Sequence, residues 1–429
     1  MHIYFSGIGG AGISSAALLA HQAGFTVSGS DKQDGSYIHY LQKAGVRDIA
    51  IGQSYQHIAA THAAKPIDWF VYTSALTMEQ QDAPELRFCR EHGIKTSKRD
   101  EFLNMLIQKK NQKLIAVAGT HGKSTTTAMI IWLFKELNVP VSYAVGAKMN
   151  VGELSLFDPK SEYFVYECDE FDRNFLAFRP YISVITGLAW DHHEIFPTQE
   201  AYSHAFRDFI SQSRRTILWR SDFSALHLQK NQTLEVLAHN EAHIAQLNLA
   251  GRFNREDGWL AIQTVARITS RDPATFTASM NRFPGLAQRM ERLAPNVYTN
   301  YAHTPEKIKG GMSAAQEIAA PGQKIIVIYE PLTNRRQYFI QNDYKDCFAG
   351  AAKLYWVPTY LAREDPAQPV LTPKQLITHL ARPKIAEPAE LDSQLAAAIR
   401  THVKNGDLVV AMGASGAGSL DEWLRALVA

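Results

Sequence analysis

The stretch that decides the fold lies at residues 114–124 and reads LIAVAGTHGKS. The apolar run at 114–118 predicts a β-strand, and the loop at 119–123 is followed by a predicted helix at about 124–137. Backbone N–H groups of such a loop cradle phosphate oxygens, while Lys123 can neutralise the terminal phosphates and the Ser124 hydroxyl can bind Mg²⁺. The standard pattern has a glycine where this chain has Val117, so we predict a variant phosphate loop that binds a nucleoside triphosphate.

A second glycine loop occurs at the start of the chain. Gly7, Gly9 and Gly12 follow a predicted strand and precede a predicted helix at 14–23, and Asp31 comes 19 residues after Gly12. This spacing is close to that of a dinucleotide-binding fingerprint, in which glycines let the backbone approach a diphosphate. The motif alone leaves open a diphosphate-containing ligand, a nicotinamide dinucleotide, or a tight turn without a ligand.

The rest of the chain has the pattern of an α/β protein. Short apolar runs alternate with stretches of helical periodicity, which is typical of parallel sheets covered by helices. A chain of 429 residues is also long enough for two or three hydrophobic cores. A polar stretch at 97–101 is interpreted as a crossing between domains. Besides residues 114–118, we predict strands at 2–6, 25–28, 69–73, 163–167, 182–186, 216–219, 297–299, 325–329, 354–357 and 408–412.

Composition narrows the class of protein. Lys and Arg number 44 against 42 Asp and Glu, and the net charge of +2 lacks the basic excess of a nucleic-acid-binding protein. The three cysteines are far apart, so neither a disulfide framework nor a CxxC metal site is expected. No apolar stretch approaches the ~18 residues needed to span a bilayer, and no export signal is visible. We therefore expect a cytoplasmic protein that binds neither nucleic acid nor membrane.

Acidic and histidine residues follow two of the predicted strands. Glu167 ends the strand at 163–167, where it would face the phosphate loop as an oxygen ligand of Mg²⁺. It begins the acidic run ECDE at 167–170, for which a solvated turn is the alternative. The run DHHE at 191–194 follows the strand at 182–186. Because adjacent side chains cannot all converge on one ion, we favour one or two of them acting beside the phosphates.

The last third of the chain contains three further motifs. Residues 300–305, NYAHTP, follow a predicted strand, with Thr304 suited to the N-cap and Pro305 to the first turn of a helix. Arg335 and Arg336 could bind a carboxylate by bidentate pairing, although a surface arginine pair is usually solvated. The glycine-rich residues 413–418 predict a strand-to-helix turn.

Taken in order, these motifs resemble those of the Mur ligase family over nearly the whole chain. The similar segments are GIGGAGIS at 7–14 with VSGSD at 27–31, GTHGKS at 119–124, QRME at 288–291 and NYAHTP at 300–305. The resemblance implies an ATP-dependent ligase of peptidoglycan biosynthesis that activates a carboxylate as an acyl phosphate and joins it to an amine. It also implies three domains: a Rossmann-like UDP-sugar-binding domain at 1–98, a central P-loop ATPase-like domain at 99–293, and a Rossmann-like domain for amino acid and nucleotide at 294–429.

The resemblance also implies which residues form the sites. The catalytic residues would be Lys123, His192 and Arg289, and closure of the domains onto ATP would exclude water. Mg²⁺ would be held by Ser124, Glu167 and His192, and the 25 residues between the last two match the family pattern. Tyr301 and Arg336 would contact the incoming amino acid. ATP would be bound by Gly119, Thr120, His121, Gly122, Lys123, Ser124, Thr125, Arg289, Asn300 and His303, and the UDP-sugar by Gly7, Gly9, Gly10, Gly12, Ser30 and Asp31.

The substrate is narrowed by the same comparison. The resemblance is closest to the branch that adds L-alanine to UDP-N-acetylmuramate. The family usually has Asp at Asn300, Asn at Gly187, and in this branch a His-Arg pair after Pro331. Residues 329–334, with 190–192 and 195–196, are closer to the branch that joins a recycled cell-wall tripeptide to UDP-N-acetylmuramate. This second branch is the first alternative, a nicotinamide-dependent oxidoreductase or a non-catalytic nucleotide switch are the others, and a monomer or homodimer is expected.

Overall fold

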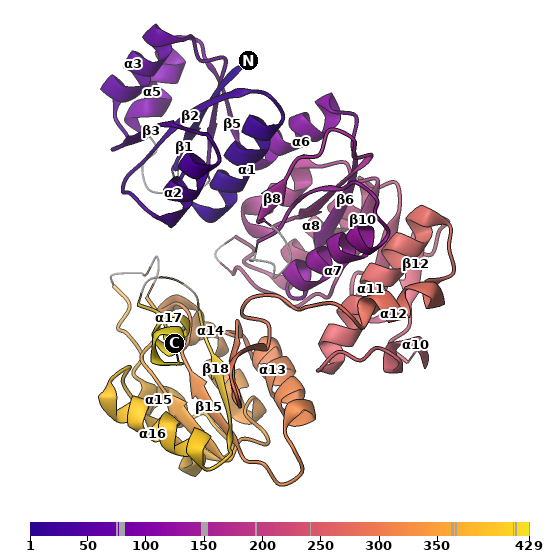
Figure 1. The fold of residues 1–429 in the computed structure, drawn as a ribbon, viewed down its shortest axis with the longest axis vertical. Coiled ribbons are helices and arrows are strands. Elements are labelled where there is room, and N and C mark those ends of the chain that lie inside the picture. The colour runs from indigo at the N-terminus through magenta and orange to yellow at the C-terminus, as the bar shows by residue number, and fades with distance from the viewer. Residues whose placement is uncertain are drawn as a thin grey trace. The chain divides into compact units, whose positions relative to one another are not determined.

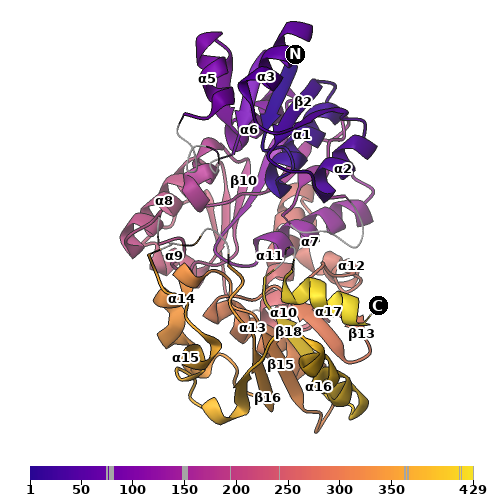
Figure 2. The ribbon, with the colours of Figure 1, turned by 90° about the vertical axis from the view of Figure 1, so that its left-hand side faces the viewer.

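The computed structural model describes residues 1–73, 76, 82–146, 153–193, 195–240, 242–361, 364, 367–414, 416 and 418–428. The chain divides into two compact units, of which the first comprises Met1–Gln246 and Asp257–Phe283 and the second Leu247–Glu256 and Pro284–Ala429 (Figures 1 and 2). The first unit contains two sheets and the second contains one, so the described residues form one sheet for each predicted domain. The domain boundaries at 98/99 and 293/294 stay predictions.

The first sheet is a doubly wound parallel sheet with the strand order β3-β2-β1-β4-β5. Helices α1 and α6 contribute to the core on the face of Ile3 and Phe5, whereas α3 and α5 pack against the face of Tyr4 and Phe70. The strand order reverses beside β1, which is where sheets of this kind bind ligands. The elements are β1 (His2–Ser6), α1 (Ala11–Gln22), β2 (Thr26–Asp31), α2 (Ser36–Lys43), β3 (Asp48–Ile51), α3 (Tyr55–Ala64), β4 (Trp69–Tyr72), α5 (Pro84–Glu91), β5 (Lys95–Lys98) and α6 (Arg99–Lys109).

The second sheet has the order β12-β11-β10-β6-β9-β7-β8, and only β7 and β8 pair antiparallel among its described strands. Because β6 lies between β10 and β9, the segments that follow these three strands meet at one edge. The elements are β6 (Lys113–Ala118), α7 (Lys123–Glu136), β7 (Ser142–Ala144), β8 (Ser155–Leu156), β9 (Tyr163–Glu167), the 3₁₀ helix η1 (Phe171–Ala177), β10 (Ile182–Ile185), α8 (Gln199–Ser211), β11 (Thr216–Trp219), α9 (Arg220–Ala225), β12 (Leu234–Leu237), α10 (Ala242–Ala245), α11 (Arg252–Thr269), η2 (Pro273–Phe276) and α12 (Thr277–Met280).

The third sheet has the order β13-β14-β18-β15-β16-β17, with β13 antiparallel to β14 and the other pairs parallel. Its elements are β13 (Glu291–Ala294), β14 (Val297–Asn300), α13 (Pro305–Ile318), β15 (Ile325–Tyr329), α14 (Asn334–Ile340), η3 (Gln341–Asp346), β16 (Lys353–Trp356), α15 (Pro373–Ile377), η4 (Pro383–Ile385), β17 (Ala386–Pro388), α16 (Ser393–Lys404), β18 (Leu408–Met412) and α17 (Leu420–Val428).

The predicted α/β class is confirmed, and each predicted strand is present with ends that differ by at most three residues. The polar stretch at 97–101, interpreted as a crossing, contains the end of β5 and the start of α6. Ser97 tolerates a strand position because its Oγ accepts the indole N–H of Trp69 at 2.9 Å. Thr304 is the N-cap of α13, as predicted. In the predicted turn at 413–418, Ser415 and Ala417 lie outside the described residues, as does Glu194 of the DHHE run.

Two broader expectations concern cysteines and membranes. Cys89, Cys168 and Cys347 are free and buried, as expected for a chain without a disulfide framework. Among the described residues, no helix combines the length and apolar character needed to cross a membrane.

The core of the third sheet is built around Trp356, which is fully buried between Tyr329, Tyr344 and Phe348, with ring centroids 4.9 to 5.7 Å away. Its indole N–H has no hydrogen-bond partner among the described residues. We expect Trp356→Ala to lower the free energy of unfolding of the second unit by about 3–5 kcal/mol, because a large cavity is left. Trp356→Phe should cost less, since it also removes the unpaired donor. Thermal unfolding measures both, and equal costs would contradict this account of the core.

Candidate active site

The phosphate loop joins β6 to α7 and requires glycine at two positions. Gly119 and Gly122 have φ values of +143° and +80°, which favour glycine. A methyl group at Gly119 would lie 2.5 Å from Oγ1 of Thr186, and one at Gly122 would lie 2.5 Å from Oδ1 of Asp257. Gly122 is the N-cap of α7 and has no side chain, so the first amides of the helix can serve phosphate oxygens.

Lys123 lies at the start of α7 with its ammonium group held in the loop. Nζ donates to the carbonyl of Gly119 at 2.6 Å and to Oε2 of Glu170 at 2.7 Å. Burial opposes the charge on Lys123, but Glu170 and Asp169 raise the pKa of the amine above its ordinary value, so it stays protonated. Glu170 is almost completely buried, and the sequence gave no reason to single it out from its acidic neighbours. The loop therefore presents a fixed positive charge to a phosphate group.

Ser124 and Glu167 form the second part of the site. The Ser124 hydroxyl donates to Oε1 of Glu167 at 2.8 Å, and the amide of Gly146 donates to Oε2 at 2.7 Å. A hydroxyl and a carboxylate in contact beside a phosphate loop are the hard oxygen donors that Mg²⁺ prefers. These two predicted ligands therefore fit a magnesium ion bound to a nucleotide. Thr125, the next residue of α7, is buried.

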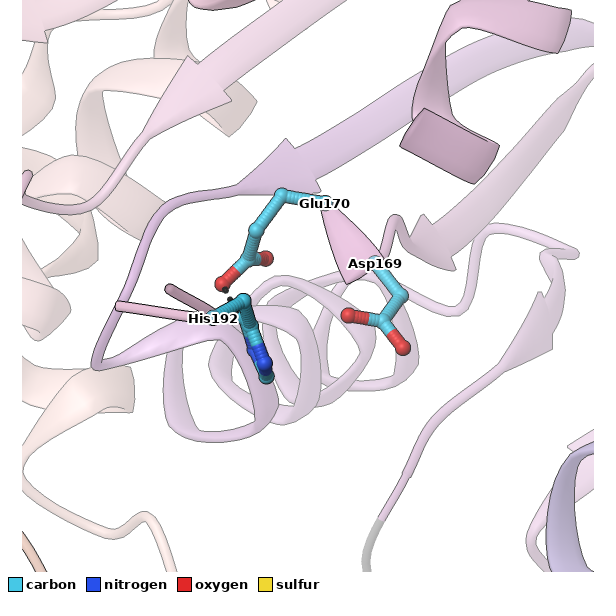
Figure 3. A group of neighbouring side chains, drawn as sticks. All are labelled: Asp169, Glu170 and His192. Carbon is cyan, nitrogen blue, oxygen red and sulfur yellow. Dashed lines mark ion pairs between the residues drawn. The ribbon is translucent and has the colours of Figure 1, made fainter. Parts of the chain in front are cut away.

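His192 lies beside the same acidic cluster but on a different partner. Side-chain ligand atoms of Asp169, Glu170 and His192 lie within 4.8 Å of one another (Figure 3). The distance from His192 Nε2 to Glu170 Oε1 is 3.7 Å, and the imidazole also packs against Phe171. Its φ of +55° is a left-handed conformation that costs energy in a non-glycine residue and is often found at functional sites. That His192 binds Mg²⁺ with Glu167 stays a prediction.

Two other predicted ATP-binding side chains also contribute to the shape of the loop. Thr120 Oγ1 lies 2.7 Å from the carbonyl of Ala189 and 2.6 Å from the hydroxyl of Tyr202, which fixes it against the segment after β10. His121 covers Gly187, where an added methyl group would lie 2.7 Å from Nε2. Gly187 also has a φ of +146°, so both the space and the backbone explain the glycine at this position.

The segment that carries His192 is held from below by a buried carboxylate on α9. Asp222 Oδ1 accepts the amide of Leu188 at 3.1 Å, while Oδ2 has no partner among the described residues. Burial raises the pKa of Asp222 to about 7, and the bond from Leu188 partly opposes the shift. The folded protein therefore keeps a proton that the unfolded chain releases near pH 4, and stability falls as the pH rises from about 4 to 7.

We expect Asp222→Asn to remove this loss, because the amide resembles the protonated acid. Relative to the parent protein, the variant should gain about 2–4 kcal/mol between pH 4.5 and pH 8, since each pKa unit corresponds to about 1.4 kcal/mol. The difference in melting temperature between the two proteins, measured across this range, tests the prediction. A difference that does not change with pH would contradict it.

The first glycine loop lies at the carboxyl end of β1 in the first sheet. The amides of Gly7 and Ile8 both donate to the carbonyl of Ser30, at 2.8 and 2.9 Å, which ties the loop to β2. Asp31 Oδ2 accepts the amide of Gly9 at 2.8 Å, so the predicted acid faces the loop. Gly10 is the N-cap of α1 and has no side chain to cap the helix. The start of α1 is thus available to an anion.

Ser30, predicted to bind the UDP-sugar, points instead into a buried network around Glu85. The hydroxyls of Ser30, Ser6 and Tyr4 donate to the Glu85 carboxylate at 2.5, 2.5 and 2.9 Å. Burial raises the pKa of Glu85, and the three hydroxyl bonds oppose the shift. This network ties β1 and β2 to α5. Sequence reasoning missed it because no local pattern connects Glu85 with residues so far away in the chain.

In the second unit, three predicted residues come together after β13 and β14. The Arg289 guanidinium lies 5.0 Å from the ring centroid of Tyr301, which packs edge-on against His303 at 4.7 Å. The side-chain oxygen of Asn300 accepts the amide of Met290 at 3.3 Å, so Asn300 shapes the backbone beside Arg289. Arg336 lies apart from these residues, on α14. Contacts of all these side chains with ATP or an amino acid stay predictions.

A domain with a phosphate loop and hard oxygen donors, together with a doubly wound sheet that has its own glycine loop, defines a nucleotide-dependent enzyme with a second ligand site. Residues 2–111 match the profile of the Mur ligase family, catalytic domain, and residues 117–250 match that of the Mur ligase middle domain. The chain belongs to the Mur ligase family. This confirms the ligase class predicted from the sequence and supports ATP as the nucleotide.

The chain is similar to several named proteins. UDP-N-acetylmuramate–L-alanine ligases from Paenarthrobacter aurescens and Clostridium tetani are 29% and 28% identical to it; the matches cover 96% of this chain and 94% and 95% of those proteins. Among solved structures, UDP-N-acetylmuramate-alanine ligase from Thermotoga maritima has a TM-score of 0.76 at 23% identity, and a murein peptide ligase from Psychrobacter arcticus has 0.66 at 22%. Both comparisons cover 100% of this chain and 98% of the other, and show a shared fold.

Proposed function

We propose that the protein joins L-alanine to UDP-N-acetylmuramate and converts ATP to ADP and phosphate in doing so. The observation that carries this proposal is the contact of Lys123 with Glu170 and of Ser124 with Glu167 at a phosphate loop, in one unit with a second glycine loop. The similarity to named L-alanine ligases over almost the whole chain supports the choice of substrates.

In the proposed reaction, a carboxylate oxygen of the sugar nucleotide attacks the γ-phosphorus of ATP, and ADP leaves. The amine of L-alanine then attacks the acyl phosphate, and the tetrahedral intermediate collapses to an amide with release of phosphate. Lys123 and the amides at the start of α7 would hold the phosphates, and positioning with charge neutralisation would supply most of the rate. Ser124 and Glu167 would hold Mg²⁺, which would neutralise phosphate charge when bound.

The remaining predictions belong to the same proposal. Gly7, Gly9, Gly10 and Gly12 would contact the UDP diphosphate, and Asp31 would fix the loop. Arg289, Asn300 and His303 would contact ATP, and Tyr301 and Arg336 the amino acid. The cytoplasmic location and the monomeric or homodimeric state also stay predictions.

An assay of ADP release and amide formation tests the substrate choice. The purified protein is given ATP, Mg²⁺ and UDP-N-acetylmuramate with L-alanine, other single amino acids, or the cell-wall tripeptide. We expect ADP and amide only when the sugar nucleotide and an amine are both present, with the highest kcat/KM for L-alanine. A preference for the tripeptide would support the recycling ligase instead, which the fold similarity to a murein peptide ligase keeps in view. ADP release that needs neither co-substrate would contradict a ligase.

A further inference from the structure

An arginine that the sequence did not single out lies directly over the first glycine loop. Arg99 is the first residue of α6, and its side chain is about 19% exposed. A methyl group at Gly12, in the first turn of α1, would collide with Nη1 of Arg99. The guanidinium therefore occupies the space above the start of α1, which explains why this helical position needs a glycine.

The Arg99 side chain is held in place from one side only. Nε and Nη2 donate to the Asp100 carboxylate at 3.1 and 2.9 Å, and the hydroxyl of Tyr166 donates to the same carboxylate at 2.6 Å. Asp100 and Tyr166 are both buried. Nη1 has no hydrogen-bond partner among the described residues, so the free edge of a fixed guanidinium faces the glycine loop.

The position of Arg99 is costly unless an anion is bound. A cation in the first turn of α6 opposes the helix dipole, and the guanidinium also approaches the positive end of α1. Burial adds a further penalty, which Tyr166, Asp100 and Asp169 outweigh, so the pKa of Arg99 lies above its ordinary value and the charge is kept. A guanidinium edge and the uncapped amides of a helix start, aimed at one place, are a matched pair of donors for phosphate oxygens.

We propose that Arg99 binds the diphosphate of the sugar nucleotide through Nη1, together with the amides at the start of α1. This inference rests on the proposed function, in which the first glycine loop holds a UDP-sugar. Arg99 then fixes the sugar nucleotide from α6, the first helix after the first sheet, while Asp100 and Tyr166 act as positioning residues for the guanidinium.

Binding measurements on the full chain with three ligands test this proposal. UDP has the diphosphate alone, UDP-N-acetylglucosamine adds a sugar, and UDP-N-acetylmuramate adds a carboxylate. We expect Arg99→Gln to weaken all three by about 10- to 100-fold, as for the loss of a charge-assisted hydrogen bond, and to leave the Kd of ATP within about threefold. Arg99→Lys, which keeps the charge opposite Asp100 but not the fork, should lose less.

Lys98 provides a matched control, because its ammonium pairs with Asp172 of η1 and not with the loop. Lys98→Gln should leave the Kd of all three UDP ligands unchanged. Gly12→Ala should displace the guanidinium, so Gly12→Ala with Arg99→Gln should be no weaker than the worse single variant. ATP binding in the same samples reports whether each variant is folded.

Two results would overturn the proposal while leaving the proposed function intact. Unchanged binding of all three ligands to the glutamine and lysine variants would show that Arg99 has a structural role only. Weaker binding of UDP-N-acetylmuramate alone would place Arg99 on the carboxylate and not on the diphosphate. Failure of the parent protein to bind any of the three would instead contradict the proposed function, and this inference with it.

Discussion

Lys123→Ala should lower the rate of ADP formation by at least about 1,000-fold, the scale found for groups that neutralise charge in phosphoryl transfer. Lys123 is the cation that the phosphate loop holds in place, through Gly119 and Glu170. The rate is measured with saturating UDP-N-acetylmuramate and L-alanine. The Kd of UDP should not change, because the first glycine loop lies on another sheet.

The same substitution leaves Glu170 buried without its partner, which could unfold the protein at a cost of about 3–5 kcal/mol. Lys123→Ala combined with Glu170→Gln separates the two effects, since the neutral amide needs no cation. We expect the double variant to recover most of the lost melting temperature and none of the activity. A double variant that is folded and active would contradict the assignment of Lys123 to the phosphates.

Glu167→Gln should lower kcat by about 100- to 1,000-fold and raise the Mg²⁺ concentration needed for half-maximal rate by at least about tenfold. The carboxylate accepts from Ser124 and from the amide of Gly146, and the glutamine amide group can keep only one of these bonds. The rate is measured against Mg²⁺ concentration at fixed ATP.

Glu162 precedes the same strand and serves as the matched control. It is exposed and pairs with Lys113 at the other end of β9. Glu162→Gln should therefore keep both the rate and the Mg²⁺ dependence of the parent protein. If Glu167→Gln showed an unchanged Mg²⁺ dependence, the magnesium site would have to be sought among Asp169, Glu170 and His192.

Much of the fold could be predicted because the central strands are short, apolar and followed by glycine. β1, β6, β10, β15 and β18 are buried on both faces, and such strands leave a continuous apolar signal in the sequence. The unpredicted strands are short and lie at or near the edges of the sheets, where a polar composition such as KTSK in β5 gives no apolar signal. These strands are β3, β5, β7, β8, β12, β13 and β17.

The site was predictable in proportion to how local its chemistry is. The phosphate loop and Glu167 could be found because each motif directly follows a strand, and parallel strands bring their carboxyl ends together. Glu170, Glu85 and Arg99 could not, since their partners are far apart in sequence and meet only through packing. Ser30 shows the reverse case, because a residue inside a ligand motif turned out to bond a buried carboxylate.

The most direct test of the central claim follows the carboxylate oxygen of the sugar nucleotide. UDP-N-acetylmuramate with ¹⁸O in its carboxylate is incubated with ATP, Mg²⁺, L-alanine and the protein, and the phosphate released is analysed by mass spectrometry. An acyl-phosphate mechanism predicts that one labelled oxygen passes to phosphate in each turnover, because that oxygen bonds to the γ-phosphorus and leaves with it. Amide formation with unlabelled phosphate, or with the label in AMP, would contradict the mechanism.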